Sequence, residues 1–267
     1  MYNVARFLIL SILFTSCDKY EEQKLLSATN ENSKYVVVEI HKRYTDKDSI
    51  WQNTTTTRNY DSQNRLISIN HNSFHFYNSK NQINKIKYLY NRGGESFTRI
   101  INEDYIYDKK GNLVAVINYH NANGDTIKRY SYDSQNNLVF EGNSTISSEF
   151  KYYNGKLIEK KEIENGEVWK ISTYKYDSLG RKEIEDWIFS DERKMRTYFR
   201  YNSKGKLISE RDSSFEKTST PNEYVEFKTE YYYSENDSIS QIKHLGRIFS
   251  EKEFKIRGRE TFQYIKK

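Results

Sequence analysis

Few residues of this 267-residue sequence stand at spacings suited to catalysis or metal binding. Cys17 is its only cysteine, so no disulfide within the chain and no dithiol site can form. His71 and His75 could share a strand face, but no cysteine or patterned carboxylate completes a metal set around them. The sequence also lacks a nucleophile elbow, a phosphate loop and an HExxH motif. We therefore predict no bound metal, no cofactor and no catalytic residues.

Carboxylates at alternate positions provide the weakest alternative, a glycan-degrading enzyme. Glu183 and Glu185 would project from one face of a strand, as the acid and nucleophile of a glycosidase must. A chain with 37 acidic residues has such spacings by chance, however. We expect the protein not to be an enzyme.

Aromatic residues are the better functional lead. Trp51, Trp169 and Trp187, together with tyrosines at 152–153 and 231–233, offer flat rings that could stack on sugars. The alternative is that tyrosine is the packing residue of a repeated unit, with its ring buried and its hydroxyl in water. Both interpretations stay open at this point, and the three tryptophans are the speculative binding residues.

The first 16 residues have the character of a removable export signal. Arg6 is followed by an apolar run, 7–14 (FLILSILF), which is too short to span a bilayer because about 20 apolar residues are needed. Small residues then lead directly into Cys17. We predict a signal peptide at 1–16, a lipidated cysteine with a flexible polar tether at 17–34, and one β domain at 35–267.

The order LFTSC at 13–17 resembles the lipobox of bacterial lipoproteins, in which acyl chains such as palmitate are attached to the cysteine. Each buried methylene adds roughly 0.8 kcal/mol to membrane binding, so several chains anchor a protein stably. The segment KYEE at 19–22 resembles the charged export signal of Bacteroidetes surface lipoproteins. The resemblance implies a lipid anchor at Cys17 in the outer membrane, with surface exposure or the periplasmic side both open.

One short pattern recurs along the rest of the chain: Tyr, Asp or Asn, two variable residues, a turn former, one more residue, and usually Leu or Ile. The full copies begin at Tyr60, Tyr77, Tyr107, Tyr132, Tyr176, Tyr201 and Tyr233, and a contracted copy begins at Tyr153. The turn formers are Asn64, Asn81, Gly111, Asn136, Gly180, Gly205 and Asp237. These residue types tolerate the left-handed backbone that a hairpin loop ending in a bulge requires. The mean period is about 25 residues.

Each period is predicted to hold two antiparallel strands. Asn-Gly and Gly-Gly pairs, such as Asn123-Gly124 and Asn165-Gly166, supply a second class of hairpin turn between the tyrosine turns. The abundance of Tyr and Phe favours strands, and the segment 35–44 is the expected opening strand. The predicted fold is an all-β antiparallel meander of about eight hairpin repeats and 16 to 18 strands, forming a long curved or wrapped sheet.

The tyrosine turns resemble the YD repeats of the rearrangement-hotspot (RHS) family, over about residues 60–239. In that family the repeats build a wall, and the large members enclose a toxin. Eight copies are too few to enclose a domain, so the resemblance implies the hairpin turn and not the encapsulating role.

The distribution of charge along the chain argues against a nucleic-acid partner. The 43 basic and 37 acidic residues are interspersed along the chain, which is typical of a solvated surface and not of a nucleic-acid-binding stripe. The leading hypothesis is a non-catalytic, membrane-anchored scaffold or binding module of the cell envelope, with a glycan or envelope protein as ligand. The rival is an immunity or partner protein that docks a secreted toxin.

Overall fold

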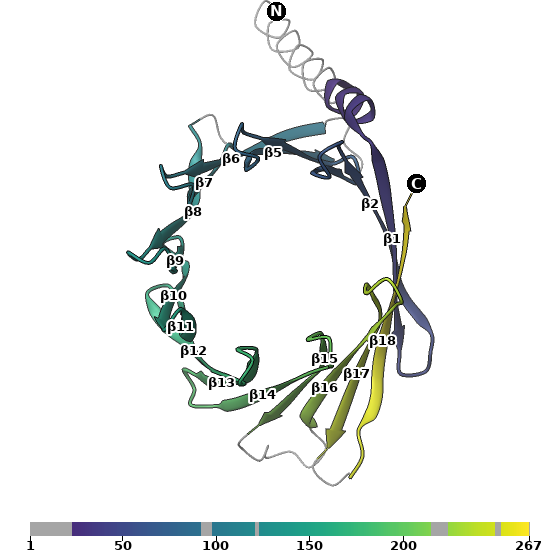
Figure 1. Ribbon diagram of the computed structural model, residues 1–267, viewed down its shortest axis with the longest axis vertical. Helices are drawn as coiled ribbons and strands as arrows, with labels where there is room; N and C mark the ends of the chain where they lie inside the picture. Colours follow the sequence, from purple (N-terminus) through teal and green to yellow (C-terminus); the bar gives the residue numbers. More distant parts are fainter. Residues whose placement is uncertain (1–22, 92–97, 121–122, 215–223, 249–251, 267) are drawn as a thin grey trace, which may run out of the picture. The chain divides into compact units, whose positions relative to one another are not determined.

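The computed structural model describes residues 23–91, 98–120, 123–214, 224–248 and 252–266 (Figure 1). The predicted signal peptide and Cys17 lie outside these ranges. Residues 23–32, which belong to the predicted tether, are helical, and Leu25 of this helix is buried. Within the described ranges, no helix is long and apolar enough to cross a membrane.

All other regular elements within the described ranges are strands, and their number agrees with the expected 16 to 18. In chain order they are β1 (Tyr35–Thr45), β2 (Ile50–Tyr60), β3 (Leu66–Ile69), β4 (Ser73–Tyr77), β5 (Ile83–Asn91), β6 (Thr98–Tyr107), β7 (Leu113–Asn118), β8 (Asp125–Tyr132), β9 (Leu138–Gly142), β10 (Ile146–Tyr153), β11 (Lys156–Glu164), β12 (Glu167–Tyr176), β13 (Lys182–Phe189), β14 (Lys194–Tyr201), β15 (Leu207–Ser214), β16 (Tyr224–Tyr233), β17 (Ile239–Ile248) and β18 (Lys255–Lys266).

The strands form a single sheet that closes on itself. Strands that follow one another in the chain pair antiparallel, as in β12–β13 and β16–β17, and β1 pairs with both β2 and β18. This is the connectivity of an 18-stranded antiparallel β-barrel, so the predicted open curved or wrapped sheet of hairpin repeats is wrong. Closure has a physical reason: an open sheet leaves two edge strands with unpaired N–H and C=O groups, and pairing the first strand with the last removes both edges.

The chain comprises two compact units. Unit 1 comprises residues 1–39, 56–128 and 264–267, and unit 2 comprises residues 40–55 and 129–263.

The tyrosine turns have the predicted backbone. All seven turn formers have positive φ, for example 60° at Asn64 and 79° at Gly180, and the strand register shifts next to the tyrosine in each copy. In the turn after β12, the Asp177 Oδ1 accepts hydrogen bonds from the backbone N–H of Leu179 and Arg181, each at 2.9 Å. The Arg181 Nε donates to the other carboxylate oxygen at 2.7 Å. The Asp or Asn after the tyrosine therefore closes the loop.

Five of the turn tyrosines link their hairpin to the one before it. The Tyr201 hydroxyl donates to the Lys182 carbonyl at 2.8 Å, and the Tyr233 hydroxyl donates to the Leu207 carbonyl at 2.8 Å. The same bond, from a turn tyrosine to the carbonyl of a residue beside the preceding turn, is formed by Tyr77, Tyr107 and Tyr176. One interpretation of the sequence placed these hydroxyls in water; in the structure each of the five donates to a backbone carbonyl.

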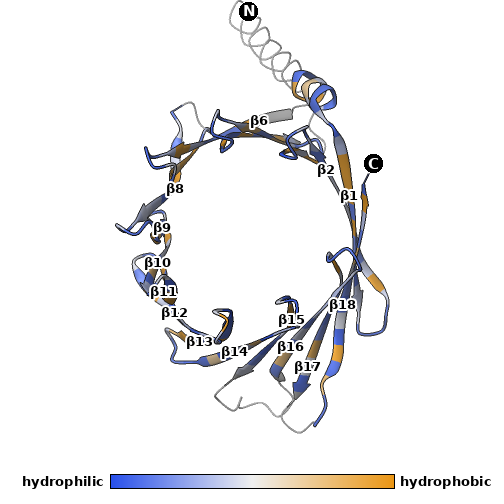
Figure 2. Ribbon diagram, in the orientation of Figure 1, coloured by the Kyte–Doolittle hydropathy of each residue, from blue (hydrophilic) through white to orange (hydrophobic). Residues whose placement is uncertain are grey.

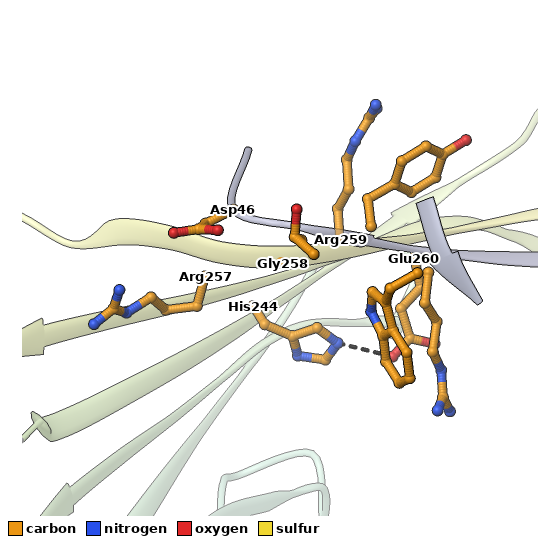
Figure 3. A pocket seen from close by; sticks show the side chains of 10 residues that line it. Asp46, His244, Arg257, Gly258, Arg259 and Glu260 are labelled. Carbon is orange, nitrogen blue, oxygen red and sulfur yellow. Dashed lines mark hydrogen bonds and ion pairs between the residues drawn. The ribbon is translucent and has the colours of Figure 1, made fainter. Parts of the chain in front are cut away.

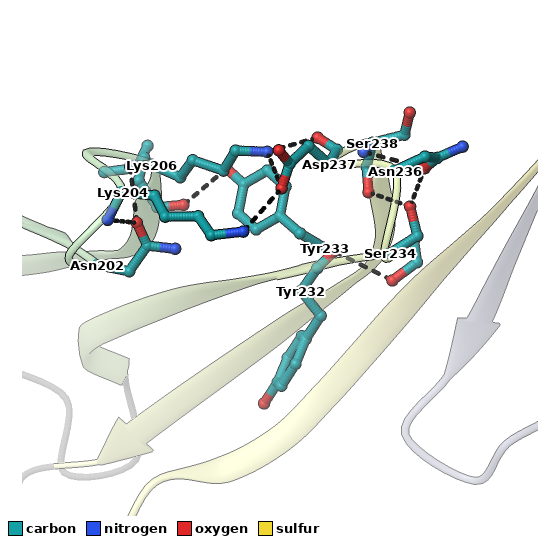
Figure 4. Close-up of polar contacts among 11 residues, drawn as sticks. Asn202, Lys204, Lys206, Tyr232, Tyr233, Ser234, Asn236, Asp237 and Ser238 are labelled. Carbon is teal, nitrogen blue, oxygen red and sulfur yellow. Dashed lines mark hydrogen bonds and ion pairs between the residues drawn. The ribbon is translucent and has the colours of Figure 1, made fainter.

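A basic side chain often completes this link. The Lys206 ammonium lies 4.7 Å from the centre of the Tyr233 ring and donates to the Asp237 carbonyl at 2.8 Å (Figure 4). Arg181 lies over the Tyr201 ring in the same way, at 4.7 Å. Neighbouring turns are thus joined by a hydrogen bond and a cation–π contact, and Lys206 adds an ion pair with Asp237 at 2.8 Å.

The apolar core is thin. Among the described residues the buried hydrophobic side chains are Leu25, Phe74, Ile86 and Val116, while Ser68, Ser172 and Thr197 are buried as well. Figure 2 shows hydrophilic residues along most strands. Backbone pairing and polar side-chain contacts therefore carry much of the stability, since little apolar area leaves water.

Candidate binding site

A pocket of about 540 Å³ in unit 2 is lined by residues of β1, β2, β17 and β18 (Figure 3). Trp51, one of the predicted binding residues, stands beside it with 59% of its surface exposed. The Arg43 guanidinium lies 5.7 Å from the centre of the Trp51 ring. An exposed indole next to a hollow is unusual, because large aromatic side chains generally bury their rings.

The polar side of this pocket is organised around Glu260 of β18. The His41 and His244 Nε2 atoms lie 2.6 Å and 2.9 Å from its two carboxylate oxygens, and the Arg43 Nε lies 3.5 Å away. Burial alone would raise the pKa of Glu260, but the hydrogen bonds from His244 and His41 and the charge of Arg43 together lower it. Glu260 is therefore held ionised, and it fixes the imidazole rings of His41 and His244 in place.

A second aromatic side chain of the pocket is also covered by a cation. Arg259 lies 4.3 Å from the centre of the Tyr44 ring and forms an ion pair with Asp48 at 3.0 Å. Gly258 lies between these groups, and a Cβ at this position would stand 3.0 Å from the Tyr44 carbonyl oxygen. The pocket thus combines aromatic surfaces with guanidinium, imidazole and carboxylate groups, which suits a ligand that has both apolar ring faces and hydroxyl groups.

The other two predicted binding residues form a separate group. The Lys170 ammonium lies 5.2 Å from the Trp169 ring centre and 5.0 Å from that of Trp187. Phe189 contacts both rings, at 6.2 Å and 6.3 Å between centres. Lys170 also pairs with Glu162 at 2.5 Å. Trp169 and Trp187 therefore pack against their neighbours, and the structure does not bring the three tryptophans into one platform.

The two residues of the predicted carboxylate pair have different surroundings. Glu183 is exposed, whereas the Glu185 carboxylate forms an ion pair with Lys182 at 2.8 Å. Sequence reasoning missed Glu210 and Asp212, whose pKa values are raised by burial. Asp212 accepts a hydrogen bond from the Thr197 hydroxyl at 2.6 Å.

The histidines hold no metal set. His75 donates to or accepts from the Ser73 hydroxyl at 2.9 Å, and burial lowers its pKa, while His71 lies in the turn between β3 and β4 with φ of 54°. No group of three His, Cys, Asp or Glu side chains that could hold a metal ion occurs among the described residues. The role of His41 and His244 beside Glu260 was not foreseen, because these residues are more than 200 positions apart in the chain.

Comparison with known proteins does not assign a family. No family model and no curated protein matches the chain. Among solved structures, a porin-like protein from Bacteroides uniformis is similar over 88% of this chain and 99% of its own, with 12% identity and a TM-score of 0.39. That likeness is too low to carry an argument about function. The description of the chain as an RHS-like open repeat sheet is corrected, because the sheet is closed. The comparisons do not support the resemblance to the YD-repeat family or to lipoproteins, which stays a prediction.

Proposed function

We propose that the protein is a non-catalytic binding module of the cell envelope and that the Trp51 pocket takes a sugar ring. The single observation that carries this proposal is the exposed indole of Trp51 at a pocket of about 540 Å³, a size suited to one or two sugar rings. The indole presents an apolar surface for the C–H face of a sugar. Arg43, Asp46 and Glu260 supply hydrogen-bond donors and acceptors for hydroxyl groups.

Binding is a better match than catalysis for the chemistry of this pocket. Its half-buried carboxylate, Glu260, is engaged by His41, His244 and Arg43, so it is a poor general acid. Catalysis of glycoside hydrolysis requires a second carboxylate facing the first across the scissile bond. The remaining carboxylate of the pocket, Asp46, lies in the exposed turn between β1 and β2.

The proposed location is the cell envelope, with lipid attached at Cys17. Its support is the sequence pattern of residues 6–17 alone. Metabolic labelling with a fatty-acid analogue tests this part: label should enter the wild-type protein and not the Cys17→Ser variant. Equal labelling of both proteins would refute the lipid anchor and would leave the proposal for the Trp51 pocket unaffected.

Titration with a panel of soluble polysaccharides tests the binding function. We expect at least one glycan to bind, and Trp51→Ala to weaken it about tenfold, which corresponds to roughly 1.4 kcal/mol. The matched control is Trp169→Ala, which removes an equally large side chain from the group around Lys170 and should leave affinity unchanged. Equal loss in the two variants, or hydrolysis of the bound glycan, would overturn the proposal.

A further inference from the structure

Strands β14–β17 sort their charges onto opposite faces of the sheet. In antiparallel pairing, residues directly opposite each other share a face, so the register assigns every side chain to one side. Arg196, Tyr198 and Arg200 of β14 lie opposite Ser213, Arg211 and Ser209 of β15, and the same parity continues into β16 and β17. We call this side the basic face. Its cations are Lys194, Arg196, Arg200, Arg211, Lys228, Lys243 and Arg247.

All the lysines and arginines of these four strands lie on the basic face. The opposite face of the same strands has the carboxylates Glu210 and Asp212 and, among its described side chains, no lysine or arginine. The basic face has two carboxylates, Glu226 and Glu230, against seven cations. The excess is five positive charges, or four when Asp186 of β13, which pairs with Arg196, is included. The two faces of these strands therefore differ in the sign of their charge.

Like charges are also placed directly opposite each other on this face. Arg211 lies opposite Lys228, and Lys243 lies opposite Arg259 of β18. Such cross-strand pairs destabilise a sheet. Glu226 offsets part of the repulsion, because it pairs with Arg211 at 2.9 Å and with Arg247. Arg200 and Lys194 make no ion pair within the described part of the chain, and both are exposed. The arrangement is therefore better suited to an external anion than to stability of the sheet alone.

A pocket and two tyrosines lie on this face. A hollow of about 580 Å³ is lined by Arg200, Ile208, Lys228 and Tyr232 among others. Tyr232 is 38% exposed and points away from its neighbour Tyr233 (Figure 4), and the Lys243 ammonium lies 4.8 Å from the centre of its ring. Tyr198 is 37% exposed. Cations and partly exposed rings thus alternate along an open surface.

We propose that the basic face binds an acidic polysaccharide. Regularly spaced sugar carboxylates would pair with Arg200, Arg211 and Lys243, and the tyrosine rings would pack against sugar faces. The positive excess matches an anionic polymer, and Glu226 and Glu230 can accept hydrogen bonds from sugar hydroxyl groups. The proposal concerns residues other than those of the Trp51 pocket and does not depend on it.

Titration of the purified full chain with polygalacturonate tests the proposal, with neutral dextran, single-stranded poly(dT) and phosphatidylglycerol vesicles as comparison probes. We expect polygalacturonate to bind, dextran to bind at least tenfold more weakly, and added salt to weaken the polygalacturonate complex, because exposed charges are screened. The double variant Arg200→Glu/Lys243→Glu should lose at least tenfold in affinity. The milder Arg200→Gln/Lys243→Gln variant should lose less, and its unfolding curve verifies that the fold is kept.

The matched control is Lys109→Glu/Lys110→Glu, which makes the same change of net charge in the exposed turn between β6 and β7. It should bind polygalacturonate as the wild type does, and so should Trp51→Ala. Equal weakening by the control would show that net charge alone attracts the polymer and would overturn the proposal. Tighter binding of poly(dT) or of the vesicles, or no binding of polygalacturonate, would overturn it as well.

Discussion

The hydrogen bond from a turn tyrosine to the preceding hairpin can be tested by removing a single oxygen atom. In the Tyr201→Phe variant the ring and its contact with Arg181 remain, while the 2.8 Å bond to the Lys182 carbonyl is lost. A hydrogen bond of this kind contributes about 0.5–1.5 kcal/mol, and leaving the half-buried carbonyl without a partner keeps the cost toward the upper end of that range. We expect the free energy of unfolding to fall by about 1 kcal/mol.

Urea unfolding followed by tyrosine and tryptophan fluorescence measures this change. The matched control is Tyr153→Phe, since Tyr153 belongs to the contracted copy and is 68% exposed; its free energy of unfolding should stay within about 0.3 kcal/mol of the wild type. Tyr201→Phe and Tyr233→Phe should add in the double variant to within about 0.5 kcal/mol, because each bond joins a different pair of turns. A loss at Tyr201 no larger than at Tyr153 would refute the idea that these hydroxyls tie the hairpins together.

The turns and the opposite face of the sheet give three further predictions. Asp177→Ala should destabilise the protein because it removes the loop-closing carboxylate. Asp177→Asn should cost less at neutral pH, since Asn202 closes its own turn in the same way and only the ion pair with Arg181 is lost. Hydrogen bonds from Arg181 lower the pKa of Asp177, so the stabilising effect of this carboxylate is present above about pH 4 and is lost on acidification. The difference in unfolding free energy between the wild type and Asp177→Asn should therefore shrink between pH 6 and pH 3 in parallel urea titrations. Burial raises the pKa of Asp212, so the folded state disfavours the charged form of this side chain. Asp212→Asn should therefore increase the free energy of unfolding at pH 7. This gain should disappear as the pH falls and Asp212 becomes protonated. Gly180→Ala should destabilise the protein by about 1 kcal/mol, because φ of Gly180 is 79°. Gly180→Asn should cost less, since Asn136 adopts φ of 69° at the equivalent position of its turn. Equal effects of the two substitutions would contradict this explanation.

The two faces of β14–β17 suggest why the apolar core can be so thin. Buried carboxylates and hydroxyls on one side, such as Asp212 and Thr197, satisfy each other, and paired charges on the other side, such as Arg211 and Glu226, cover the sheet without apolar packing. A closed set of backbone hydrogen bonds does not need a second layer to protect its edges. The same arrangement leaves polar side chains available for ligands on the surface.

Local structure could be predicted from the sequence in detail. The tyrosine turns require a left-handed residue four positions after the tyrosine. Gly, Asn and Asp adopt that conformation more readily than other residues, so Asn64 and Gly180 predict the backbone of their turns. The charge sorting was also present as alternation, in Lys194, Arg196 and Arg200 at even positions of one strand, but it was missed because the charges were judged by their mixture along the chain and not by strand parity.

Closure of the sheet and the composition of the pocket were decided only by the tertiary structure. Pairing between β1 and β18 joins segments from opposite ends of the chain, and no local residue preference encodes which distant strands meet. The same applies to Glu260, which gathers His41 and His244 from two other strands. Turn chemistry is local and can be read residue by residue, whereas the choice of partner strand depends on the summed register and twist of all the hairpins between them.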